Sequence, residues 1–138
     1  MKIIVALDDK DGMMFNKRRQ SQDKALRERV LKLTEGSVLW MNEYSKKQFE
    51  TDGTLPTHVI VDETFLQKAT DGEYCFVENI SLTSAKEQIE EMVIYKWNRR
   101  YPGDRFLDVR PEDMGLACKS IEEFAGSSHE KITMEIWG

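Results

Sequence analysis

The sequence predicts an α/β fold with a mostly parallel central sheet and an antiparallel hairpin at its C-terminal end. Three observations support this class. Residues 2–7 (KIIVAL) are apolar without alternation, which is typical of a strand buried on both faces. Segments of strand and helix character then alternate along the chain, as they do in parallel sheets. The last segment, residues 130–137, alternates well enough to be an antiparallel strand after a short Gly-Ser loop.

The longest strand is expected within residues 91–106 (EMVIYKWNRRYPGDRF), and the rest of the chain is organised around it. Gly103 followed by Asp104 indicates a bend near the end of this stretch. The other strands are expected at residues 38–41, 58–61, 74–77, 106–109 and 116–124.

Helices are expected between these strands, at residues 21–33, 42–49, 62–69 and 83–88. Ser21 and Asp62 carry side chains that can accept hydrogen bonds from the free N–H groups at the start of a helix. Gly36 suits the left-handed position that closes the first helix. Residues 13–21, between the first strand and the first helix, are expected to form a loop.

Composition sets the class of protein. The 138 residues suffice for one domain with its own core. A net charge of −5 argues against a general affinity for nucleic acid or anionic membranes. No apolar run reaches the length of about 18 residues that a transmembrane helix needs, and no signal peptide precedes the first strand. Cys75 and Cys118 are expected to be two buried thiols of a cytoplasmic protein, and the two histidines show no metal-ligand spacing.

Three short segments, in their order along the chain, resemble the dihydrofolate reductase family. Residues 33–41 (LTEGSVLWM) are similar to the family's helix end followed by the strand G-K-P-V-I-M. Residues 102–106 (PGDRF) are similar to its G-D-x-x-F, and residues 127–136 are similar to its closing hairpin. The resemblance implies a three-layer, dihydrofolate-reductase-like domain over residues 1–138, with a shortened cofactor-binding region.

The residues that carry the reaction in that family are not matched here. The position of the family's carboxylate on the first helix falls on Leu26, and neither Asp23 nor Glu28 is in register with it. Residues 18–21 (RRQS) stand in place of the family's Trp-Pro pair in the first loop.

The cofactor motifs are not matched either. The family's G-R-x-T, which holds phosphates at a helix N-terminus, is replaced by residues 42–45 (NEYS), where Glu43 would repel phosphate. Its paired glycines are replaced by Glu78 and Asn79, whose side chains would obstruct a dinucleotide. The resemblance therefore predicts neither bound NADPH nor folate reduction, and we expect no cofactor, no metal and no catalytic residue of that reaction.

The pocket that holds the pterin in the family is expected to be apolar here. Its expected lining is Val5, Ala6, Leu26, Val30, Val77 and Tyr95. Such a pocket could take a small aromatic ligand, or side chains such as Met13 and Phe15 could fill it. We favour the filled form.

Two basic clusters, at residues 17–19 and 98–100, could form an anion site if the fold brings them together. The candidate residues for this site are Arg18, Arg19, Asn98, Arg99 and Arg100. The alternative is two solvated loop ends. Trp97 and Tyr101 beside the second cluster could stack on a ring, although packing in the core is the commoner role of such side chains.

Two further groups of residues have simpler interpretations. Residues 127–130 (SSHE) contain the side-chain types of a catalytic triad, but consecutive residues cannot converge on one atom, so we expect turn roles and a local hydrogen bond for His129. Asp8, Asp9 and Asp11 lack the spacing of a calcium loop, so we expect a solvated turn.

The sequence thus favours a binding or interaction module without folate reductase activity. The expected partner is a protein or a small molecule, with no membrane and no nucleic acid, and a homodimer is left open. The alternative is an enzyme or small-molecule binder with altered specificity for a nucleotide, a pterin or another heterocyclic anion. A filled pocket would favour the module, with a partner surface around residues 42–56.

Overall fold

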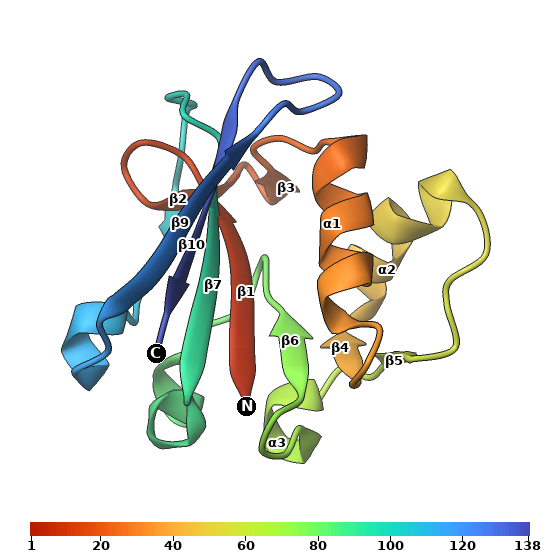
Figure 1. The fold of residues 1–138 in the computed structure, drawn as a ribbon, viewed down its shortest axis with the longest axis vertical. Helices are drawn as coiled ribbons and strands as arrows, with labels where there is room; N and C mark the ends of the chain where they lie inside the picture. Colours follow the sequence, from red (N-terminus) through yellow and green to blue (C-terminus); the bar gives the residue numbers. More distant parts are fainter.

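The computed structural model describes all residues from Met1 to Gly138. Seven strands form the central sheet in the order β5-β4-β6-β1-β7-β10-β9 (Figure 1). The pairs on both sides of β1 are parallel, and β10 runs antiparallel to β7 and β9. The strands are β1 (Lys2–Leu7), β4 (Leu39–Met41), β5 (Val59–Val61), β6 (Tyr74–Phe76), β7 (Glu91–Lys96), β9 (Cys118–Phe124) and β10 (Ile132–Trp137). The predicted α/β class, with its mostly parallel sheet and antiparallel C-terminal hairpin, is confirmed.

A second, antiparallel sheet has the order β3-β2-β8 and contains β2 (Gly12–Phe15), β3 (Arg18–Arg19) and β8 (Arg105–Phe106). The prediction of a loop at residues 13–21 was therefore wrong. Asn16 and Lys17 both have positive φ, as the tight turn of a hairpin requires. The hairpin pairs with β8, some 90 residues away, and no local pattern in the sequence reveals so distant a partner. The strand expected at residues 106–109 had the wrong bounds, because β8 contains only Arg105–Phe106.

The helices are α1 (Lys24–Thr34), α2 (Glu43–Phe49) and α3 (Phe65–Lys68), with 3-10 turns at Glu50–Asp52, Thr83–Gln88 and Pro111–Met114. The predicted N-cap of α1 was wrong, because Asp23, not Ser21, accepts hydrogen bonds from the N–H groups of Ala25 and Leu26. Asp62 does not cap α3 but accepts from Thr64. None of the helices combines the length and the apolar composition that a membrane-spanning segment needs.

Strand β7 ends at Lys96, well before the bend that the sequence predicted as its end. Asn98 has a φ of 60°, a left-handed conformation that does not continue a strand. Its amide donates hydrogen bonds to the Lys131 carbonyl and the Thr133 hydroxyl instead. Residues 97–104 consequently form a loop beyond the carboxyl end of the sheet.

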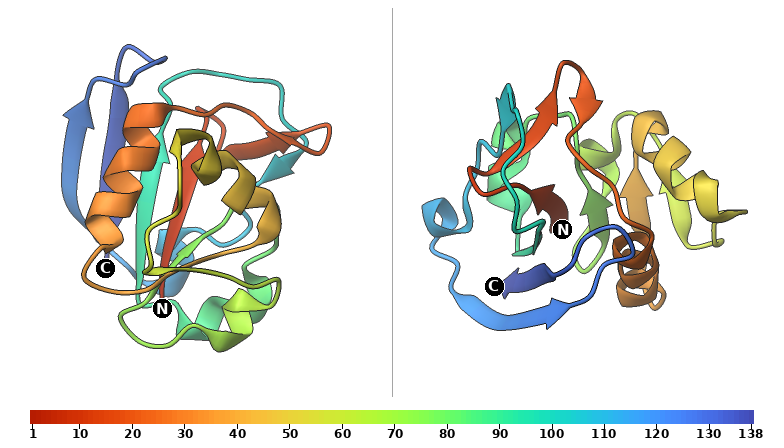
Figure 2. Two further views of the ribbon diagram at one scale, coloured as in Figure 1. Left: turned by 90° about the vertical axis from the view of Figure 1, so that its right-hand side faces the viewer. Right: turned by 90° about the horizontal axis from the view of Figure 1, so that it is seen from above.

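The strand β1 separates two apolar cores. Its alternation places Ile3, Val5 and Leu7 in one core and Ile4 in the other. Helix α1 covers the second core, while α3 and the Thr83–Gln88 turn cover the first (Figure 2). Cys75 is buried in the first core, but Cys118 is exposed on the edge strand β9. The prediction of two buried thiols was therefore wrong for Cys118.

Candidate functional site

A small enclosed cavity lies at the carboxyl ends of β1, β6 and β7, where open α/β sheets commonly bind ligands. Its volume is about 10 Å³, the space of roughly one water molecule. One wall is apolar and the other is polar. The apolar wall consists of Ala6, Met13, Leu26, Phe76, Val77 and Trp97, and the polar wall of Arg19, Ser21, Gln48 and Glu78.

The structure brings together only part of the pocket expected from the sequence. Ala6, Leu26 and Val77 line the cavity. Val5 and Val30 lie in opposite cores, away from it. Tyr95 is buried on the α1 side of the sheet against Phe124, and burial raises the pKa of its phenol, which has no hydrogen-bond partner.

Met13 fills the space as expected, but Phe15 does not. Met13 is buried and forms part of the cavity wall. Phe15 is 46 % exposed, because it lies where β2 leaves the body of the protein for the hairpin turn. The space is thus filled by one methionine together with the polar side chains of the opposite wall.

An ion pair between Arg19 and Glu78 closes the polar wall. The Nε and Nη2 atoms of Arg19 donate to the two oxygens of Glu78 at 2.8 and 3.2 Å. Burial acts to lower the pKa of Arg19. The hydrogen bonds and the charge of Glu78 outweigh this effect, so the pKa lies above its ordinary value. The Ser45 hydroxyl and the Gln48 amide also donate to Glu78, at 2.7 and 3.2 Å. The charge of Glu78 is therefore compensated inside the protein.

The start of α2, where the sequence resemblance implies a phosphate site, is occupied by the protein's own side chains. The side-chain Oδ1 of Asn42 accepts from the Ser45 N–H, and a Glu63 carboxylate oxygen accepts from the Glu43 N–H. The Asn42 amide donates to Asn79 at 2.9 Å. Because these N–H groups already have acceptors, they are not free to bind a phosphate.

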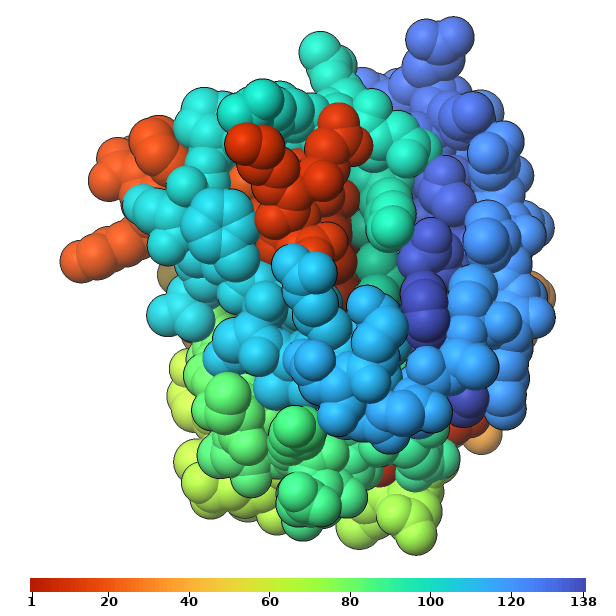
Figure 3. All heavy atoms as spheres, turned by 90° about the vertical axis from the view of Figure 1, so that its left-hand side faces the viewer, coloured from red at the N-terminus to blue at the C-terminus, as the bar shows by residue number.

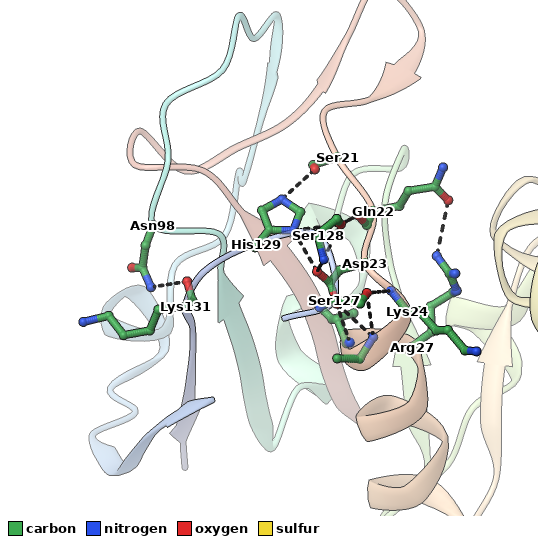
Figure 4. Close-up of polar contacts among 12 residues, drawn as sticks. Ser21, Gln22, Asp23, Lys24, Arg27, Asn98, Ser127, Ser128, His129 and Lys131 are labelled. Atoms are coloured by element: carbon green, nitrogen blue, oxygen red, sulfur yellow. Dashed lines mark hydrogen bonds and ion pairs between the residues drawn. The ribbon is translucent and has the colours of Figure 1, made fainter. Parts of the chain in front are cut away.

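A partly buried polar chain beside the cavity joins the segment before α1 to the loop before β10 (Figure 4). The Nδ1 atom of His129 lies 2.9 Å from an oxygen of Asp23, and its Nε2 atom lies 2.8 Å from the Ser21 hydroxyl. The Tyr101 hydroxyl is 3.1 Å from the same Nε2, and the imidazole stacks on Trp97 with ring centres 4.5 Å apart. The expected role of His129, a local turn contact, is therefore incomplete.

Asp23 anchors this chain. Its side chain is fully buried and accepts from the backbone N–H groups of Ser127 and Ser128 as well as from the first turn of α1. Burial acts to raise the pKa of Asp23, but the hydrogen bonds, including the one to His129, hold it far below its usual value. Ser21, His129 and Asp23 are hydrogen-bonded in the same sequence of roles as the catalytic residues of nucleophilic hydrolases. The cavity beside Ser21, however, has a volume of only about 10 Å³.

The two basic clusters lie on either side of Tyr101 and Pro102. These two residues line one groove with Arg18 and another with Arg100. Arg99 is also exposed, with its guanidinium 6.0 Å from the ring centre of Tyr101. Two of the candidate anion-binding residues are committed elsewhere, Arg19 to Glu78 and Asn98 to the backbone of Lys131.

Asp8 is a structural residue rather than part of a solvated turn. It is buried, and one oxygen accepts from the N–H groups of Lys10 and Gly12. The other accepts from the Tyr101 N–H at 3.1 Å and from the Gln20 amide at 3.2 Å. A Cβ atom at Gly12 would lie 2.5 Å from the Gln20 amide nitrogen and 2.8 Å from an Asp8 oxygen, so a larger residue there would displace these side chains. No group of three acidic, histidine or cysteine side chains could hold a metal ion.

Sequence reasoning missed the Ser21–His129–Asp23 chain and the Arg19–Glu78 pair. His129 and Asp23, like Arg19 and Glu78, are more than 50 residues apart in the sequence. Only the position of the acidic residue just before α1 could have indicated one of these sites from a local pattern. No protein-family model matches the chain, and no curated protein matches it.

Proposed function

We propose that the protein is a binding module with a dihydrofolate-reductase-like fold that does not reduce folate. The mostly parallel sheet, the C-terminal hairpin and a helix between β1 and β4 support the resemblance. The observation that carries the proposal is the filled cavity. Pockets for small molecules have about 300–1,000 Å³, whereas this cavity has about 10 Å³.

The cofactor side supports the same conclusion. Glu78 and Arg19 occupy the place where the resemblance puts a close approach of backbone to dinucleotide, and they are fixed by Ser45 and Gln48. Breaking such a buried pair is strongly unfavourable, because it leaves a buried charge without a partner. A dinucleotide would have to displace it.

The partner surface expected at residues 42–56 gains little support. Its exposed side chains are mostly charged, and Lys46 lies within 4 Å of both Glu43 and Glu50. Phe49 is buried in the second core. Two of the four exposed large apolar side chains, Phe15 and Phe106, lie on the smaller sheet instead.

Thermal unfolding with NADPH, NADP⁺, folate and dihydrofolate tests the proposal. A ligand at about 100 times its dissociation constant adds about 2.7 kcal/mol, or several degrees in a domain of this size. We expect no shift with any of the four and no oxidation of NADPH in the presence of dihydrofolate. An active dihydrofolate reductase in the same buffers is the positive control. A shift with NADPH together with NADPH oxidation would refute the proposal.

The Ser21–His129–Asp23 chain favours a second candidate, an enzyme with altered chemistry in which Ser21 is the nucleophile. The two distances of 2.8 and 2.9 Å meet the requirement that a base contacts both the nucleophile and an orienting carboxylate. A fluorophosphonate probe distinguishes the two candidates. Labelling that is lost in Ser21→Ala and kept in Ser128→Ala would favour the enzyme, and no labelling favours the binding module.

A further inference from the structure

Six lysine and arginine side chains without ion-pair partners lie on the segments that form or adjoin the smaller sheet. They are exposed, and we call the surface that they share with the β3-β2-β8 sheet the basic face: Lys10, Lys17, Arg18, Arg99, Arg100 and Arg105. Figure 3 shows this side of the molecule, where the β2–β3 hairpin projects beside the chain around residue 100. Four acids lie among them. Asp8 lines a groove on this face but is buried and accepts four hydrogen bonds. Asp11 is paired with Arg110, Asp104 accepts from the Asn16 N–H, and only Asp9 has no partner for its side chain.

The basic face also carries exposed aromatic rings. Phe15 is 46 % exposed and Phe106 is 48 % exposed, while every other phenylalanine is buried or half-buried. Leaving two such rings in water forgoes the stabilisation that their burial would give. Rings of this kind beside arginines are what proteins use to stack the bases of nucleic acid.

Two open grooves run beside each other across this face. One, of about 330 Å³, is lined by Phe15 and Arg18, and the other, of about 530 Å³, by Phe106 and Arg100. Tyr101 and Pro102 line both grooves and form the ridge between them. Each groove thus offers one exposed ring and at least one free arginine.

The ridge is held in place by the buried carboxylate beneath it. The Tyr101 N–H donates to Asp8, and the Gln20 amide donates both to Asp8 and to the Pro102 carbonyl. The Tyr101 hydroxyl lies 3.1 Å from His129. A side chain at Gly103 would lie 2.8 Å from Gln20, so the loop packs closely here. A surface fixed before binding loses less entropy when a ligand is bound.

We propose that the basic face binds single-stranded nucleic acid, with neighbouring bases stacked on Phe15 and Phe106 and the phosphates bound by the free arginines. Two grooves that share a ridge suit consecutive nucleotides of a strand better than one mononucleotide. A duplex would keep its bases stacked inside and could not use the rings. This assignment rests on the proposed function, because it names the partner of the binding module.

The net charge of −5 is a sum over the whole chain, so it argues against a general affinity for nucleic acid but not against binding at one basic surface. The phosphate backbone interacts with the local charge, within a Debye length of about 8 Å at physiological salt. On the basic face the free cations outnumber the acids, so the overall acidity lies elsewhere on the molecule.

Fluorescence anisotropy with labelled oligo-dT and oligo-U of about 12 nucleotides, a length within the usual site size, tests the proposal. We expect saturable binding that weakens with salt, and a salt slope that falls by about 0.7 for each contacting arginine that is removed. Phe15→Ala and Phe106→Ala should each weaken binding by about fivefold to 100-fold. Arg18→Gln and Arg100→Gln should lower the salt slope.

Matched controls come from exposed side chains elsewhere on the molecule. Ile121→Ala removes an exposed apolar side chain from β9, and Lys86→Gln removes a free lysine from the Thr83–Gln88 turn. Both should bind like the wild type. Circular dichroism should show that all variants are folded, because the substituted side chains are exposed.

Four outcomes would overturn the proposal. They are no binding at low salt, equal loss of binding in the control variants, equally tight binding of a duplex or a mononucleotide, and competition by inorganic polyphosphate with no effect of the two phenylalanine variants. None of these changes the outcome with NADPH and dihydrofolate, so the proposed function is judged separately.

Discussion

Three buried carboxylates fasten the loops around the candidate site. Asp8 holds the Tyr101 loop, Asp23 holds the loop before β10, and Glu78 holds β3. Each accepts several hydrogen bonds, as a buried charge must if its burial is not to destabilise the protein. Single side chains therefore help to fix the positions of these loops.

The stability that Asp23 contributes should depend on pH. Its pKa is lowered on folding, so its contribution is complete above the ordinary value of about 3.9 and is lost as the pH falls towards the folded value. Asp23→Asn should cost about 3 kcal/mol at pH 7, because an amide cannot accept all of these hydrogen bonds. In urea unfolding from pH 7 to pH 2, the difference between wild type and variant should shrink below about pH 4.

Asp9→Asn is the matched control, because Asp9 is an exposed aspartate whose side chain has no partner. Its unfolding free energy should stay within about 0.5 kcal/mol of the wild type. A constant difference between wild type and Asp23→Asn down to pH 2 would contradict the role assigned to this carboxylate.

The β3-β2-β8 sheet is attached both by Met13 and Met14, which are buried in the first core, and by one ion pair. Strand β3 has only two residues, and Arg19 links it to Glu78 and to α2, where its guanidinium also lies 4.4 Å from the Tyr44 ring centre. The Arg19 N–H donates to the Tyr44 hydroxyl at 2.7 Å. The same contacts close the cavity, so attachment of the sheet and closure of the cavity are one structural feature.

Removing one partner of this pair should cost more than removing both. Arg19→Met should destabilise the protein by about 3–5 kcal/mol because Glu78 remains buried without its partner. Arg19→Met combined with Glu78→Leu should recover part of that loss, and a double-mutant cycle in urea measures the coupling.

The exposed pair Arg29–Glu122 serves as the comparison, since its two hydrogen bonds of 2.9 and 3.1 Å have similar geometry. Its removal should cost less than about 1 kcal/mol. Equal coupling energies for the two pairs would show that burial adds nothing to the Arg19–Glu78 pair.

At the scale of the whole molecule, two apolar cores share one sheet. Ile3 and Ile4 are neighbours on β1, and both are fully buried, but they face different cores. A strand common to both cores ties their stability together. We therefore expect the two cores to unfold in a single step, as small domains usually do.

Ile3→Val and Ile4→Val test this expectation. Each removes one buried methylene and should cost about 1 kcal/mol. Tryptophan fluorescence and far-ultraviolet circular dichroism should give one coincident transition in urea for the wild type and both variants. Two transitions, with one variant shifting only the first and the other only the second, would contradict a shared unfolding step.

Local features of the sequence predicted the central sheet well. The run at residues 2–7 gave β1 with its observed bounds, and Gly-Ser before an alternating segment indicated the hairpin that ends in β10. Predictions failed where a distant partner decides the structure. The apolar run at residues 13–15 is too short to predict β2 without β8, and exposure of Cys118 follows from the edge position of β9.

By itself, the sequence determined the α/β class and the order of the main strands along the chain, because these depend on periodicity and on residues near one another in the chain. Only the tertiary structure decided how the cavity is closed, that Ser21, Asp23 and His129 meet, and that Phe15 and Phe106 lie exposed among free arginines. The physical reason is that hydrogen bonds, ion pairs and grooves form between side chains that the folded chain brings together from segments about 60 to 110 residues apart.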